Sequence, residues 1–136
     1  MNKIKSNTWI ILFIVGLAFG YFAFDNIVTL PSLDPADPDR GWDWLTTDPE
    51  IIEYIKFWFR NFGIWVLAVS IFILTIAATG YRQHQRWAWY SLLYLPVHIL
   101  IHFFIWPWLI PILSIVLVLV LAALILPYRL FFPTNE

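Results

Sequence analysis

Four long apolar runs, separated by short polar or proline-rich segments, set the pattern of hydrophobic positions along this chain of 136 residues. A bilayer core about 30 Å thick needs roughly 20 apolar residues for one helical crossing. Each run is long enough to meet this requirement, so each predicts a transmembrane helix. The predicted helices cover residues 8–30, 49–80, 87–106 and 109–127.

Prolines mark the start of the second helix and the reversal between the third and the fourth. Asp48, Pro49 and Glu50 form a helix start, with an N-cap acceptor, a proline at the first helical position and an acid near the positive end of the dipole. A continuous helix over residues 87–127 would be about 60 Å long, twice the membrane core. We therefore expect the chain to reverse at Pro107.

Proline and glycine also shape the helix interiors. Pro96 lacks the N–H that would bond to the carbonyl of Leu92, which predicts a kink in the third helix. Gly16 and Gly20 form a GxxxG pattern, which lets two helix backbones approach closely. With three other helices in the chain, an internal partner is favoured, and contact with another membrane protein through these glycines stays open.

Composition places the chain among integral membrane proteins. Hydrophobic residues make up 61% of it and charged residues 12%, whereas soluble domains are about 45–50% apolar. The sequence thus predicts an all-α fold, a four-helix transmembrane bundle forming one domain over residues 1–136. A formal net charge of -1 argues against nucleic acid as a partner, and the lack of cysteine excludes disulfides and thiol catalysis.

The placement of basic residues predicts the topology. With four spans, five of them fall on one side of the membrane: Lys3, Lys5, Arg82, Arg86 and Arg129. The opposite side holds an acidic outer loop, residues 31–48, with five aspartates among prolines. By the positive-inside rule both the N- and C-termini are cytoplasmic, in a multi-pass protein of the cell inner membrane. Aromatic residues are expected at the same inner interface: Trp9, Tyr81, Trp87, Trp89 and Tyr128.

Two histidines form the clearest polar feature of the apolar runs. At 100° per residue, His98 and His102 share a stripe about 80° wide with Ser91 and Tyr94, and this stripe should face protein rather than lipid. Three roles stay open for it. The imidazoles can hydrogen-bond across the bundle, line a ligand or catalytic pocket, or bind a metal ion.

Three charged residues complete the candidate polar cluster in the outer half of the bundle. Asp25 lies near the exit of the first helix, either hydrated at the interface or paired, and Arg60 is expected to pair with Glu53, Asp25 or both. A metal bound by His98 and His102 would need a third ligand, with Asp25 the best candidate and Glu53 next. We expect no bound metal and no cofactor.

One resemblance adds to this interpretation. The aspartate–proline before the second helix, Arg60 and Gly63 near its start, and the Arg-Trp-Ala-Trp-Tyr segment at 86–90 resemble a pattern in small uncharacterised four-span bacterial inner-membrane proteins. The likeness covers about the middle half of the chain. It implies the four-span architecture and no particular activity.

Two functional hypotheses follow. In the first, the chain is a small non-catalytic interaction or accessory component of the bacterial inner membrane, with the lipid bilayer and other membrane proteins as partners. In the second, the outer half of the bundle is a binding or enzyme site for an amphipathic lipid-like or quinone-like molecule held by Arg60. The first is favoured, since the sequence has no nucleophile elbow, phosphate loop or zinc-protease motif.

Overall fold

The computed structural model of this chain is all-helical. Helices make up 88% of the described residues, and these contain no strand. The structure describes residues 7–29, 46–105 and 107–133, without the side chain of Trp108. The acidic loop up to residue 45 and the lysines of the N-terminal segment lie outside the described residues. The all-α class predicted from the sequence is confirmed.

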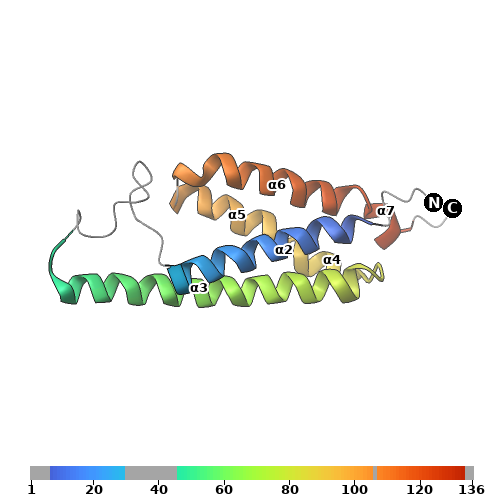
Figure 1. The fold of residues 1–136 in the computed structure, drawn as a ribbon. Helices are drawn as coiled ribbons and strands as arrows, with labels where there is room; N and C mark the ends of the chain where they lie inside the picture. Colours follow the sequence, from blue (N-terminus) through green and yellow to red (C-terminus); the bar gives the residue numbers. More distant parts are fainter. Residues whose placement is uncertain (1–6, 30–45, 106, 134–136) are drawn as a thin grey trace. The chain divides into compact units, whose positions relative to one another are not determined.

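Two long helices occupy the first part of the chain (Figure 1). Helix α2, Thr8–Phe24, continues into the π-helical turn η1, Asp25–Thr29. Helix α3, Pro49–Ile76, continues into a second π-helical turn, η2, Ala77–Tyr81. The backbone N–H of Glu50 donates to the Asp48 carboxylate at 2.9 Å, which confirms Asp48 as the N-cap of α3.

The second part of the chain contains shorter helices. Their bounds are α4, Arg86–Leu92; α5, Tyr94–Ile105; the 3₁₀ turn η3, Pro107–Leu109; α6, Ile110–Ile125; and α7, Tyr128–Phe131. The break between α4 and α5 falls at Leu93, whose N–H bonds to the carbonyl of Tyr90 at 3.2 Å. This is where the loss of the Pro96 N–H leaves the Leu92 carbonyl without its helical donor.

In the described part of the chain, three helical segments are long and apolar enough to cross a membrane: Thr8–Thr29, Pro49–Tyr81 and Arg86–Ile105. The apolar helix Ile110–Ile125 has 16 residues, which is about 24 Å at 1.5 Å per residue and shorter than the bilayer core of about 30 Å.

The chain divides into two compact units, residues 1–17 with 72–136 and residues 18–71. In the first unit α5 packs beside α6, and α4 packs against η2 (Figure 1). Its apolar core is contributed by all of its helices: Leu12, Val15, Ile73, Ile76, Ala77, Tyr81, Ala88, Leu92, Leu95, Ile99, Val120, Ala123, Leu124 and Phe131. A Cβ on Gly80 would lie 2.3 Å from Cζ2 of Trp87 and 3.0 Å from Cβ of Ala88, so glycine at this position allows α4 to approach η2 closely.

In the second unit, the end of α2 and η1 pack against α3 through small residues. A Cβ on Gly63 would lie 2.9 Å from the backbone oxygen of Ala23 and 2.7 Å from Cγ1 of Ile27. One turn earlier on α2, Gly20 faces the buried hydroxyl of Ser70, with 3.0 Å between that oxygen and an added Cβ. Gly16, in the first unit, faces Leu74 of α3 in the same way. Both glycines of the GxxxG pattern therefore contact α3 of their own chain.

Candidate functional site

The polar stripe of the third apolar run forms a chain of hydrogen bonds along α5. The Tyr94 hydroxyl lies 2.8 Å from Nδ1 of His98, and Nδ1 of His102 lies 2.9 Å from the backbone carbonyl oxygen of His98. The two imidazole centroids are 4.4 Å apart. One face of the helix therefore carries three polar side chains in succession.

The hydrogen bond of His102 fixes where its proton is. A carbonyl oxygen can only accept, so Nδ1 of His102 carries the proton and donates it. In the neutral ring, Nε2 is then the nitrogen with the lone pair. The Tyr94 hydroxyl can either donate to or accept from His98, so this contact is compatible with both tautomers of His98.

The described residues contain no group of three His, Asp or Glu side chains placed to hold one metal ion. His98 and His102 are half-buried and can supply two ligands, whereas zinc sites in proteins use three or four. Asp25, expected as the third ligand, belongs to the unit of residues 18–71. The observed chemistry of the stripe is hydrogen bonding along its own helix.

Asp25 is the first residue of η1 and is bonded within that turn. The Thr29 hydroxyl lies within hydrogen-bonding distance of the Asp25 carboxylate and 2.6 Å from the Asp25 backbone carbonyl. The neighbouring Asn26 is buried, and its Nδ2 donates to the carbonyl of Phe22 at 2.7 Å. Both polar side chains thus satisfy groups of their own helix.

The expected pairing of Arg60 is wrong. Glu53 pairs with Lys56, with 2.8 Å between Oε1 and Nζ, and the exposed Arg60 has no acidic oxygen within 4.0 Å among the described residues. The reason is spacing along α3. Lys56 lies one helical turn from Glu53 and faces it directly, whereas Arg60 lies seven residues away, a rise of about 10 Å.

The sequence analysis missed a set of hydrogen bonds at the end of α6. Pro127 has no N–H for the carbonyl of Ala123, four residues earlier, and the buried Tyr81 hydroxyl donates to that oxygen at 2.5 Å. Trp89 Nε1 donates to the next carbonyl, that of Leu124, at 3.0 Å. Pro127 could have indicated these hydrogen bonds, because a proline has no N–H to donate to the helical carbonyl four residues before it.

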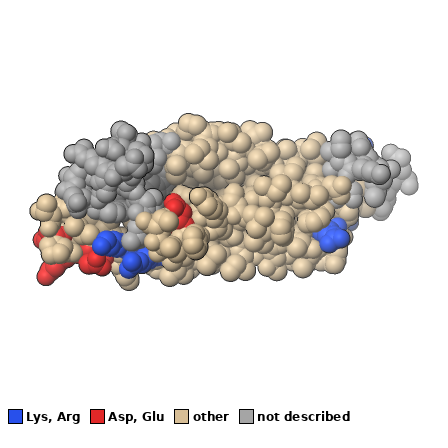
Figure 2. All heavy atoms as spheres, viewed as in Figure 1, with Lys and Arg blue, Asp and Glu red and all other residues tan. Residues whose placement is uncertain are grey.

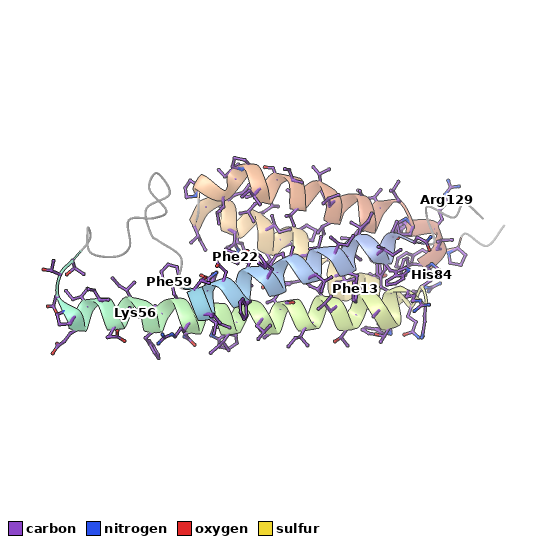
Figure 3. All side chains as sticks on the ribbon, viewed as in Figure 1. Phe13, Phe22, Lys56, Phe59, His84 and Arg129 are labelled. Carbon is purple, nitrogen blue, oxygen red and sulfur yellow. The ribbon has the colours of Figure 1, made fainter. Side chains whose placement is uncertain are left out.

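Aromatic rings and arginines gather around α7 in the same unit. Nε of Arg86 donates to the carbonyl of Phe131 at 3.1 Å, and its guanidinium lies 5.5 Å from the Phe132 ring centroid. The guanidinium of Arg82 lies 5.1 Å from the ring of Trp9. Figure 3 shows His84 and Arg129 at this end of the unit as well. Tyr81 and Trp89, two of the residues expected at the inner membrane interface, therefore bond to the end of α6.

No family model, curated protein or solved structure matches this chain. The fold and the side-chain arrangement define a class: an all-helical protein whose long apolar helices are of the kind that cross membranes.

Proposed function

We propose that this chain is a four-span integral protein of a bacterial inner membrane that acts as a non-catalytic interaction or accessory component. The observation that carries the proposal is the apolar outer surface. Large side chains point away from the packed core of their own unit, including Phe104 at 88% exposed, Trp65 at 68% and Ile125 at 66%. A bilayer is the environment in which such a surface is stable.

A non-catalytic role is supported by how the intramembrane polar groups are used. Tyr94, His98 and His102 bond along α5, and Asp25 bonds to Thr29 within η1. These contacts lie within single helices, where they orient the side chains and satisfy their polar groups in lipid.

The proposed topology places the N-terminus, the turn before α4 and the C-terminus in the cytoplasm, with α6 and the preceding η3 as the fourth span. The charge pattern supports this assignment. The charged side chains of α3 gather near its N-terminal end (Figure 2), where Glu50 and Glu53 accompany Lys56 and Arg60. The described charges after α3 are all arginines, as the positive-inside rule expects of cytoplasmic segments.

We assign the contact with other membrane proteins to the outer acidic loop, residues 31–48, rather than to Gly16 and Gly20. The two glycines face Leu74 and Ser70 of their own chain, so that surface is already used. The loop offers five aspartates to a partner with a complementary basic surface.

The second candidate is a site for an amphipathic lipid-like or quinone-like molecule, and one observation favours it. Arg60 is exposed on α3, with no acidic oxygen within 4.0 Å among the described residues. A guanidinium in this state can bind an anionic headgroup or a quinone oxygen at the membrane surface.

Reporter fusions test the proposed topology. Fusions after Asp39, after Gln85 and at Glu136 should report outside, inside and inside, because the arginines and lysines stay in the cytoplasm. A cytoplasmic signal from the fusion after Asp39 would overturn the four-span topology. Extraction at high pH provides the complementary control, since an integral protein stays with the membrane pellet.

A further inference from the structure

In the unit formed by residues 1–17 and 72–136, the charged side chains that the structure describes are all positive. They are Arg82, Arg86 and Arg129. The sequence has no aspartate or glutamate between Glu53 and Glu136, so no acidic residue lies within six positions of these arginines. Such a unit is complementary to an anion supplied from outside.

Arg129 is the arginine best placed to receive that anion. It is exposed on α7, directly after the end of α6, and has no ion pair or hydrogen bond to a side chain within the described part of the chain. The carbonyls of Ala123 and Leu124, which could otherwise attract it at the negative end of α6, are occupied by Tyr81 and Trp89.

A groove adjoins this arginine. It has a volume of about 350 Å³ and is lined by Ile125, Leu126, Tyr128 and Arg129. Its lining is mostly apolar, and Arg129 is the charged residue among the four that line it. This lining is complementary to a ligand that joins a hydrocarbon chain to a negative group, and the tyrosine is of the type found at headgroup level.

We propose that this groove binds an anionic phospholipid of the surrounding leaflet, with Arg129 on the headgroup phosphate and Ile125 and Leu126 beside the start of an acyl chain. Guanidinium suits this role because its planar donors match phosphate oxygens in pairs. Nε of Arg86, a residue of α4, donates to the carbonyl of Phe131 on α7. This hydrogen bond brings a second positive charge to the same short helix. This inference rests on the proposed membrane insertion of the chain.

The test compares two lipids that differ in headgroup charge. Full-length protein in neutral detergent is titrated with phosphatidylglycerol or with phosphatidylcholine of the same acyl chains, and bound lipid is measured by native mass spectrometry. Phosphatidylglycerol should bind more tightly, and Arg129→Gln should weaken its binding about fivefold, the effect of one basic residue near an anionic surface. Lys56→Gln is the matched control, because it removes one positive charge from α3, away from the residues that line the groove, and should leave this binding unchanged.

Further variants keep the result decisive. Arg129→Lys should retain most of the preference for phosphatidylglycerol. Leu126→Trp should weaken binding by filling the groove while all arginines remain. This second variant also tests the groove if Arg129→Gln fails to fold. Equal binding of both lipids, an unchanged affinity in Arg129→Gln, or equally tight binding of soluble glycerol phosphate overturns the inference. Membrane insertion is decided separately by extraction at high pH. A chain that is inserted yet shows no lipid preference refutes only the groove.

Discussion

The hydroxyl of Tyr81 donates a 2.5 Å hydrogen bond to the backbone carbonyl of Ala123, 42 residues later in the chain. That carbonyl has lost its helical donor to Pro127, and both Tyr81 and Ala123 are buried. An unsatisfied carbonyl in an apolar environment is costly. One side chain at the end of η2 therefore allows α6 to end at a proline without leaving a buried acceptor unpaired.

Tyr81→Phe should destabilise the protein by about 1–3 kcal/mol, because it leaves the Ala123 carbonyl buried and unpaired. The free energy of unfolding in detergent or bicelles measures the effect. Tyr128→Phe is the matched control: it removes the hydroxyl of a half-exposed tyrosine in the same unit and should change stability by less than about 0.5 kcal/mol.

Pro127→Ala tests why Tyr81→Phe should lower the stability of the protein. This substitution returns an N–H to position 127, where it can bond to the Ala123 carbonyl. Tyr81→Phe should then cost less in the Pro127→Ala background than in the native chain. If the two costs are equal, the Ala123 carbonyl is not what makes Tyr81 important.

Gly63→Ala should destabilise the protein although alanine is the better helix former by about 1 kcal/mol. The added Cβ would meet the backbone oxygen of Ala23 at 2.9 Å, and a helix backbone cannot move away by itself. Gly16→Ala is the comparison, because its Cβ would meet Cγ and Cδ2 of Leu74 at 2.9 Å, which are side-chain atoms and not backbone. Its loss of stability should be smaller than that of Gly63→Ala. Equal losses in the two variants would contradict the close crossing at Gly63.

His102 should be observed as the tautomer with its proton on Nδ1. The reason is the hydrogen bond to the His98 carbonyl, which needs a donor at that nitrogen. Imidazole ¹⁵N NMR of the protein in detergent distinguishes protonated from unprotonated ring nitrogens. A proton on Nε2 of neutral His102 would contradict this assignment. The His102 signals are identified by their absence from the spectrum of His102→Phe.

Pro96→Ala should give a continuous helix across Leu93. The substitution restores an N–H at position 96 that can bond to the Leu92 carbonyl, so the turn at Leu93 is no longer needed. Hydrogen exchange measures the outcome, since the new amide at position 96 should exchange slowly. Rapid exchange there would mean that packing, rather than the proline, interrupts the helix. Val97→Ala is a useful control because it changes an exposed neighbouring side chain and leaves Pro96 in place.

The variant His98→Phe distinguishes between the proposed roles of the histidine stripe. If the stripe stabilises the helices, this variant should fold with a loss of about 1 kcal/mol and keep any partner complex. If the stripe is a binding site, folding should persist while ligand binding is lost. The free energy of unfolding and co-purification of partner proteins, measured on the same preparation, distinguish the two outcomes.

The sequence alone predicted the features that depend on residues close together along the chain. Asp48 was identifiable as a helix cap, and Pro96 as the source of an interruption, because each acts on backbone groups within four residues. The helical class followed from apolar length, since a backbone in lipid must satisfy its hydrogen bonds within a helix. These relationships need no knowledge of which helices are neighbours.

Tertiary structure decided which side chains meet. Helices α2 and α6 are apolar on all sides, so no polar face indicates which side packs against a neighbour. Close approach at Gly63 is set by shape, and the donor for the Ala123 carbonyl comes from a residue 42 positions away. Periodicity can place a side chain on a face of its own helix, but only the folded chain brings the Tyr81 hydroxyl to the carbonyl that Pro127 leaves open.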